Sequence, residues 1–330
     1  MYAMNDTSFS KIIKKEKLML PPLAGFTDYP FRCILSMFDP PFVCTEMVNA
    51  KAVINQNEKT MEMIQKEPGN HLKGVQLIGN NPDNMQEAAI ILEKNGFDYI
   101  DINMGCTVKK VISKGQGAAL MKQEDLAVRI VEQICSIISI PVTVKMRSGF
   151  SENNKNAVSL ARKLEKAGVS AITVHGRSGE RKFGIHVDYD IIKKVSYSVD
   201  IPVIANGGVS KTNACEILKK TNAFGVMPGR NLIGDPWIFP QIKKTLSYEA
   251  FQYPSLNEKK SIIQKHLRFQ CDFYGERNGV SRFRTILPKY FRYCHNLNAL
   301  KDDVRVMCSY FDVLNILDRI IIDDEMCAYQ

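Results

Sequence analysis

Short apolar runs alternate along the chain with longer segments in which apolar residues recur at helical spacing. The runs are rich in β-branched residues, so they predict buried strands, and the longer segments predict amphipathic helices. The predicted strands are residues 18–23, 41–46, 73–78, 97–103, 141–146, 170–175, 201–206 and 223–228. The clearest predicted helices are 83–95, capped by Asp83, then 123–138, 153–167 and 210–220, the last capped by Ser210.

A repeated unit supports this alternation. Residues 92–100 (Leu-Glu-Lys-Asn-Gly-Phe-Asp-Tyr-Ile) are echoed by residues 164–172 (Leu-Glu-Lys-Ala-Gly-Val-Ser-Ala-Ile), and each unit is typical of a helix end, a glycine cap and a buried strand. Strands that alternate with helices in this way predict an α/β fold, a (β/α)8 TIM barrel. A doubly wound open sheet is the main alternative, but the sequence lacks the Gly-x-Gly-x-x-Gly that normally follows its first strand.

Polar or ionisable residues follow the apolar run at nearly every predicted strand end. Because active sites in such barrels gather at the C-terminal ends of the strands, these residues are candidates for a site. The polar or ionisable residues are Glu46, Gln76, Asn103, Cys106, Lys145, His175, Asn206 and Arg230, and Pro22, Ala24 and Gly229 stand at the same strand ends.

The last two strands carry the clearest sign of a ligand. Ala205-Asn-Gly-Gly208 follows one and Met227-Pro-Gly-Arg230 follows the other. Phosphate sites in these barrels lie in those two loops, where glycines let backbone N–H groups approach an anion and an arginine adds a charge-assisted bond. We therefore expect a phosphate-bearing ligand, with glycines that only form turns as the alternative.

Lys145 and His175 end adjacent predicted strands and should lie side by side over the barrel mouth. Two cations there suit an anionic centre, such as the N1–C2=O edge of a reduced flavin, and a Schiff-base lysine is the alternative role. Cys106 has no partners at metal-ligand spacing and no base beside it in the sequence. Since a free cysteine thiol is mostly protonated at neutral pH, proton donation is the favoured role.

Composition and charge narrow the class of protein. The 330 residues are 45% hydrophobic and 24% charged, enough for one large α/β domain and a smaller one, and the net charge of +9 favours a polyanionic partner. Nine cysteines without a Cys-x-x-Cys pair argue against a disulfide framework or a zinc site and indicate a reducing cytoplasm. No apolar run reaches the roughly 18 residues of a membrane span, and residues 1–17 lack the apolar core of a signal peptide.

The strand-helix alternation stops after Trp237, and residues from 250 onward predict helices. Segment 255–296 holds nine Lys and Arg residues against three acidic residues, with aromatic residues among them. Such a segment suits folded RNA, because cations attract phosphates and aromatic rings stack on bases. A solvated helical face over an aromatic core is the alternative, and it is favoured for the aromatic residues. We expect two domains, 1–245 and 246–330, with Lys11, Lys14, Lys15 and Lys17 as additions to the positive face.

In their order and spacing these segments resemble the tRNA-dihydrouridine synthases, in particular the bacterial B-type, over about residues 18–240 and more weakly to the end. The motifs that carry the resemblance are Pro22-Leu-Ala-Gly-Phe-Thr-Asp28, Thr45-Glu-Met-Val48, Val75-Gln-Leu-Ile-Gly79, Asp101-Ile-Asn-Met-Gly-Cys106, Gly115-Gln-Gly-Ala-Ala-Leu-Met121, Val144-Lys-Met-Arg147, His175-Gly-Arg177, Ala205-Asn-Gly-Gly208, Gly229-Arg230 and Gly234-Asp-Pro-Trp237.

The resemblance implies an FMN enzyme that reduces the C5=C6 bond of particular uridines in tRNA with NADPH, with NADH as the alternative reductant. Cys106 would protonate C5 while hydride from the reduced flavin reaches C6. The residues implied to hold FMN are Pro22, Ala24, Gln76, Lys145, His175, Asn206, Gly208, Gly229 and Arg230. The residues implied to place the uracil are Glu46, Asn103, Arg147 and Arg177. We also expect a cytoplasmic monomer with no metal.

The sequence departs from the family pattern at several positions. Thr107 stands where the family usually has Pro, Gly179 where it commonly has Arg, and Ile185 where it has Gly. Arg284 with Lys289 is the nearest equivalent of a basic C-terminal motif. Two other functions remain open: a flavin barrel that acts on a free pyrimidine, like dihydroorotate dehydrogenases, and a non-redox RNA-binding protein built on a barrel.

Overall fold

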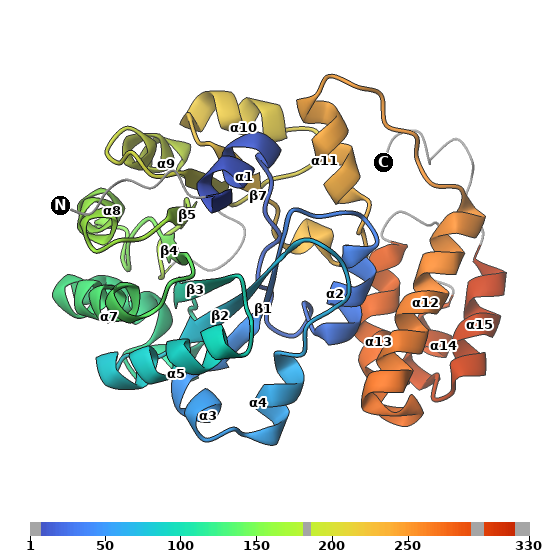
Figure 1. Cartoon of the computed structure of the whole chain (residues 1–330). Coiled ribbons are helices and arrows are strands. Elements are labelled where there is room, and N and C mark those ends of the chain that lie inside the picture. The colour runs from blue at the N-terminus through green and yellow to red at the C-terminus, as the bar shows by residue number, and fades with distance from the viewer. Residues whose placement is uncertain (1–7, 181–185, 292–299, 321–330) are drawn as a thin grey trace.

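A parallel sheet of seven strands forms the centre of the molecule (Figure 1). The computed structural model describes residues 8–180, 186–291 and 300–320. The strands are β1 (Phe42–Asn49), β2 (Leu72–Ile78), β3 (Tyr99–Met104), β4 (Val142–Arg147), β5 (Ala171–His175), β6 (Val203–Asn206) and β7 (Gly225–Met227). Each strand pairs in parallel with the next one in the chain. This sequential strand order is typical of a barrel, because the strand order of a doubly wound sheet reverses partway across the sheet.

The segment predicted as the first strand joins the sheet through a single bridge, Leu18 to Val226. The Met19 N–H donates to the Val226 carbonyl (3.1 Å), and the Val226 N–H donates to the Lys17 carbonyl (2.9 Å). Pro21 and Pro22 follow, and because proline has no N–H the ladder cannot continue. The barrel prediction is confirmed, but its expected strand at 18–23 is wrong in length.

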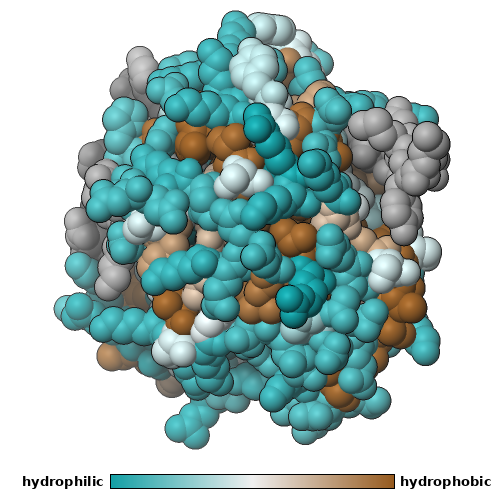
Figure 2. All heavy atoms as spheres, turned by 90° about the vertical axis from the view of Figure 1, so that its left-hand side faces the viewer, coloured by the Kyte–Doolittle hydropathy of each residue, from teal (hydrophilic) through white to brown (hydrophobic). Residues whose placement is uncertain are grey.

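Helices follow the strands and cover the outside of the sheet (Figure 1). They are α2 (Tyr29–Ser36), α3 (Ala50–Ile54), α4 (Glu58–Met63), α5 (Pro82–Lys94), α6 (Lys109–Ile112), α7 (Glu124–Ile137), α8 (Ala157–Lys166), α9 (Tyr189–Ser196), α10 (Ala214–Thr221) and α11 (Ile238–Leu246), with 3-10 turns η1 (Gly117–Lys122) and η2 (Arg230–Leu232). Their apolar sides bury residues such as Ile130 and Leu160 against the strands. Figure 2 shows the side formed by the outer helices, where hydrophilic residues cover most of the surface.

Two predicted helix caps are wrong. Asn81, not Asp83, caps α5, because Pro82 occupies the first helical position and the Asn81 side chain accepts the Asn84 N–H (2.8 Å). The Asn213 side chain accepts the Ser210 N–H (2.8 Å), so α10 begins at Ala214, beyond the predicted start.

Helix α1 (Ser8–Glu16) closes the N-terminal end of the barrel. The Phe9 ring lies 5.2 Å from the rings of both Phe42 and Tyr99, the first residues of β1 and β3, and Ile13 is buried beside them. The lysines of α1 therefore lie at the end of the barrel opposite the C-terminal strand ends. Their predicted addition to the positive face of segment 255–296 stays a prediction.

An ion pair is buried between α2 and the segment before β2. Arg32 is fully buried, and its Nε donates to Glu67 Oε2 (2.7 Å). His71 Nε2 lies 2.9 Å from Glu67 Oε1, and Arg32 Nη1 donates to the Thr27 carbonyl (2.9 Å). Burial raises the pKa of Glu67, but the hydrogen bond to His71 and the charge of Arg32 outweigh it and lower the pKa to about 2.

The chain ends in a helical region: α12 (Leu256–Tyr274), α13 (Glu276–Tyr290), α14 (Lys301–Val306) and α15 (Tyr310–Arg319). These helices share an apolar cluster that includes Leu267, Phe283 and Leu317. Helix α12 packs on α2, where the His266 ring stacks on Phe31 at 5.2 Å (Figure 1). The helices agree with the prediction, and a domain boundary at 245/246 stays a prediction. Within the described ranges, no helix is long and apolar enough to cross a membrane.

Candidate active site

The turn that carries Cys106 is held by Asn103 and Arg147. Asn103, near the end of β3, accepts the backbone N–H groups of Gly105 (3.0 Å) and Cys106 (2.9 Å) on its side-chain oxygen. Arg147, the last residue of β4, donates from Nε to the Gly105 carbonyl (2.7 Å). Cys106 itself is half-buried at the rim of the barrel mouth. The thiol is therefore mounted on a turn fixed from two strands.

A buried chain of hydrogen bonds orients Asn103 in turn. Asn103 Nδ2 donates to Gln76 Oε1 and Gln76 Nε2 donates to Asp101 Oδ2, both at 2.6 Å, while the Thr143 hydroxyl donates to Asp101 Oδ1 at 2.7 Å. Burial raises the pKa of Asp101 to about 6, although the hydrogen bonds from Gln76 and Thr143 act in the opposite direction. Sequence reasoning missed Asp101. Its spacing of two from Asn103 on one strand was the available signal, because alternate residues share a face.

Basic side chains surround the mouth at the ends of β4 and β5. Lys145 Nζ donates to Asn206 Oδ1 (3.4 Å), and Arg147 pairs in register with His175. Burial, together with the charge of Arg147, lowers the pKa of Lys145 to about 8. The expectation that His175 is a second cation is wrong: burial and the charges of Lys145 and Arg147 lower its pKa to about 2.

The neutral His175 ring has a defined tautomer. Arg177 Nη1 lies 3.3 Å from His175 Nε2, and because a guanidinium only donates, Nε2 accepts and Nδ1 carries the proton. The Gly207 loop passes directly above this ring: a Cβ at Gly207, which has φ +109°, would lie 2.8 Å from His175 Cδ2. The positive charge at this end of the site therefore comes from Lys145 and the two arginines.

The loop after β6 is closely packed, whereas the loop after β7 is open at Gly229. The Tyr189 hydroxyl and the Asn213 amide fix the first loop by donating to the carbonyls of Gly207 (3.1 Å) and Gly208 (2.9 Å). A Cβ at Gly229 would meet no atom within 4 Å, and Arg230 is exposed beside it at the start of η2. Open glycine backbone next to an arginine suits a phosphate group.

Glu46 lies in a different set of contacts. Its buried carboxylate accepts the Gly25 N–H and so holds the loop with Pro22, half-buried, and Ala24, exposed, against β1. Burial raises the pKa of Glu46, and the hydrogen bond from Gly25 opposes that rise. The other candidate residues, Gln76, Asn103, Cys106, Lys145, Arg147, His175, Arg177 and Asn206, form one connected group at the strand ends.

A polar contact joins the same loop to the helical region. Asp28 is buried, and its Oδ2 accepts from Gln270 Nε2 (2.9 Å), the Tyr274 hydroxyl (3.2 Å) and Arg282 Nη2 (3.5 Å). Its other oxygen accepts the Phe31 N–H at 3.1 Å and caps α2. One carboxylate thus positions α12 and α13 beside the mouth.

The departures from the family pattern have structural consequences. Gly179 is buried and donates to the Gly149 carbonyl (2.9 Å), and a Cβ there would lie 2.9 Å from the Phe150 carbonyl oxygen, so no arginine fits without rearrangement. Arg284 donates twice to the Met307 carbonyl (2.9 and 2.7 Å), which makes it a link within the helical region. Thr107 is half-buried next to Cys106, and Ile185 lies outside the described residues.

The fold and the site define a (β/α)8 barrel enzyme with one closed end and, at the other, a fixed thiol, clustered basic groups and an open glycine loop. A family model described as dihydrouridine synthase matches residues 19–318, and the chain belongs to that family.

Individual relatives agree with this assignment. The chain is 40% identical over 294 residues to the "probable tRNA-dihydrouridine synthase" of Rickettsia conorii, covering 88% of both chains. It is 35% identical over 280 residues to "tRNA-dihydrouridine synthase B" of Pasteurella multocida, covering 84% of both. Among solved structures, morphinone reductase is similar in fold, with a TM-score of 0.51 and 11% identity over 74% of this chain and 88% of that chain. The predicted family, fold class and enzyme class are confirmed.

Proposed function

We propose that the protein is a tRNA-dihydrouridine synthase that uses FMN and takes its electrons from NADPH, with NADH as the alternative reductant. The family assignment and the names of the relatives support the reaction, the reduction of the C5=C6 bond of particular uridines in tRNA. The observation that carries the proposal is the Cys106 thiol, held at the barrel mouth beside Lys145 and Arg147. We place the reaction in the cytoplasm.

The residues at the mouth suit FMN. Lys145 provides positive charge for the N1–C2=O edge of the ring system, and Asn206 holds its ammonium group in place. Gly229 would provide open backbone and Arg230 a guanidinium for the phosphate, with Gly208 in the neighbouring loop. Bound FMN supplies the hydride for C6 of the uracil.

The protein supplies the proton and the positioning. Cys106 Sγ holds the proton for C5, and Asn103 and Arg147 keep its turn in one conformation. Arg177, which follows β5 next to the mouth, would donate to the uracil carbonyls. Because a uridine in folded RNA must first leave its stack, contacts elsewhere on the RNA have to offset a cost of a few kcal/mol.

An anaerobic half-reaction tests the proposal. The purified protein is reduced with NADPH without oxygen, tRNA that lacks dihydrouridine is added, and the flavin absorbance is followed. We expect rapid reoxidation with dihydrouridine appearing in the RNA. A flavin that stays reduced with tRNA but is reoxidised by a free pyrimidine would instead support the small-molecule barrel. A colourless protein that binds no added FMN would support the non-redox alternative.

The pH dependence of FMN binding should report on Lys145. Because its pKa in the free protein is about 8, Lys145 is charged below that pH and loses its charge above it. We expect the Kd of the flavin-free protein for FMN to rise as pH increases through about 8, measured by flavin fluorescence. Lys145→Met should bind FMN more weakly and show no step at this pH. A step that persists in the variant would assign the titration to another group.

The RNA-facing surface should include exposed basic residues of α12. Lys265 and Arg268 are exposed one turn apart, whereas Lys259 is buried and does not belong to this face. Lys265→Glu with Arg268→Glu should weaken tRNA binding and flatten its salt dependence by about 1 in the log–log slope for each phosphate that the variant no longer neutralises. The control is Lys193→Glu with Lys194→Glu, the same charge change at exposed positions on α9. Equal salt slopes for the two variants would move the RNA face elsewhere.

A further inference from the structure

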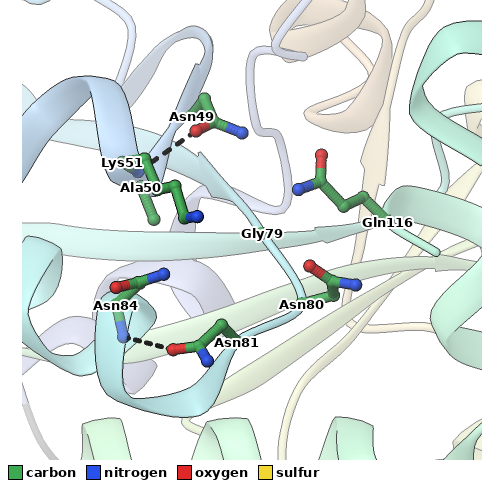
Figure 3. A pocket seen from close by; sticks show the side chains of 8 residues that line it. All are labelled: Asn49, Ala50, Lys51, Gly79, Asn80, Asn81, Asn84 and Gln116. Carbon is green, nitrogen blue, oxygen red and sulfur yellow. Dashed lines mark hydrogen bonds between the residues drawn. The ribbon is translucent and has the colours of Figure 1, made fainter. Parts of the chain in front are cut away.

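We propose that a pocket lined by side-chain amides, next to the Cys106 segment, binds the polar groups of an unpaired nucleotide adjacent to the target uridine. The inference rests on the proposed function and adds a second RNA subsite to it. The pocket has a volume of about 120 Å³. Its polar lining residues, shown in Figure 3, are Asn49, Lys51, Asn80, Asn81, Asn84 and Gln116.

The pocket lies on the same face of the barrel as the thiol. Asn49 ends β1, and Asn80 follows β2 shortly after Gln76, which orients the Cys106 turn through Asn103. Gln116 comes from the segment after Cys106 and approaches the pocket from the side opposite Asn84 (Figure 3).

Hydrogen bonds tie this segment to both places. Asn80 Nδ2 donates to the Lys114 carbonyl (2.8 Å), and the Ala118 N–H donates to the Cys106 carbonyl (3.0 Å). The segment from Cys106 to Ala118 therefore connects the thiol to Gln116, which lines the pocket.

The lining offers both donors and acceptors. The side-chain oxygen of Asn49 accepts the Lys51 N–H (3.1 Å), and that of Asn81 accepts the Asn84 N–H (2.8 Å). The NH₂ groups of both residues can therefore donate to a ligand. Asn80 uses its NH₂ group and leaves its oxygen. Among the described residues, the side-chain amides of Asn84 and Gln116 make no hydrogen bond, so each has a donor and an acceptor to offer.

This mixture selects the kind of ligand. A base edge or a ribose hydroxyl both donates and accepts, and Asn and Gln are side chains that pair with such groups. A phosphate accepts only: the exposed Lys51 ammonium would attract it, but the free oxygens of the amides would face it unfavourably. The volume is below that of pockets for whole drug-sized ligands and suits one part of a nucleotide. Extrusion of the target uridine disturbs the stacking of its neighbours and makes their polar edges available.

The test measures the binding of an unmodified tRNA transcript by filter retention. Asn84→Ala and Gln116→Ala should each raise the Kd by about 3- to 10-fold, the usual effect of losing a hydrogen bond to a ligand. The salt slope and the rate of flavin reduction by NADPH should not change, because neither charge nor the flavin site is altered. Asn95→Ala is the matched control, since Asn95 is exposed at the opposite end of α5.

Modified transcripts identify the group that binds. If the base is the ligand, an abasic nucleotide on one side of the uridine should raise the Kd of wild type to the value that the variants show with the intact transcript. The same abasic transcript should not raise the Kd of the variants further. If a ribose hydroxyl is the ligand, 2′-deoxy substitution at that nucleotide should have this effect instead.

Two results would overturn the inference. One is binding by both variants as tight as by Asn95→Ala, while wild type still forms dihydrouridine. The other is a weakened Kd accompanied by a smaller salt slope, which would indicate a phosphate ligand. Failure of the proposed function is a separate observation, because wild type itself would then form no dihydrouridine from tRNA.

Discussion

Replacing Cys106 with alanine is expected to lower uridine reduction by about 10²–10⁴-fold, the usual contribution of a general acid. The protein should remain yellow and should still be reduced by NADPH, because the role proposed for the thiol is confined to proton transfer to C5. The turn should also keep its conformation, since Asn103 and Arg147 hold it through backbone atoms of residues 105 and 106. Single-turnover formation of dihydrouridine, with flavin absorbance recorded in parallel, measures both halves of the reaction.

A second thiol provides the control for this experiment. Cys135 is half-buried like Cys106 but lies on α7, outside the barrel, and Cys135→Ala should leave both half-reactions unchanged. Loss of flavin from Cys106→Ala would assign the thiol to cofactor binding. Unchanged uridine reduction would remove it from the chemistry.

The second large effect concerns stability. Arg32→Leu should lower the free energy of unfolding by about 3–5 kcal/mol, because it leaves the Glu67 carboxylate buried without the guanidinium, with His71 as its remaining partner. Glu67→Gln should cost less, since its amide oxygen can still accept from Arg32. Chemical denaturation monitored by circular dichroism measures both changes.

The Glu67 carboxylate also makes the free energy of unfolding depend on pH in the acidic range. Its pKa is lowered from an ordinary value near 4.5 to about 2 on folding, so its contribution is complete above pH 4.5 and disappears as pH falls towards 2. Glu67→Gln should lack this part of the acid dependence. As a control, Lys163→Met removes the surface ion pair with Glu124 (2.8 Å) and should hardly change the free energy of unfolding. Equal effects of Arg32→Leu and Lys163→Met would mean that the buried Arg32–Glu67 pair contributes no more to the free energy of unfolding than a surface ion pair does.

The barrel could be predicted from the sequence because its strands are buried on both faces and appear as short continuous apolar runs. Fold rules then place the ends of those runs together, so Asn103, Lys145 and His175 could be assigned to one mouth before any coordinates. The first strand was predicted too long because apolar character was weighed above the missing N–H groups of Pro21 and Pro22. Helix caps failed where several polar residues compete within a few positions, as Asn81 and Asp83 do.

Properties that depend on spatial neighbours were not available from the sequence. His175 is neutral because it is buried and because cations from other elements lie near it. No local sequence pattern predicts these neighbours. Arg284 and Lys259 both counted as part of a basic face, yet the first binds a carbonyl within the helical region and the second is buried. Charge composition identified the region correctly as basic but did not distinguish its inward from its outward residues.

Helix α1, which closes the N-terminal end of the barrel, has a consequence for the order in which the two substrates bind. Because Phe9 and Ile13 pack across that end, ligands would approach the proposed flavin site from the C-terminal strand ends. A nicotinamide nucleotide and an extruded uridine would both need the space in front of the same flavin face. The two substrates would then have to bind one after the other. A tRNA that dissociates slowly after its uridine is reduced would delay the next reduction of the flavin, and RNA release would limit turnover.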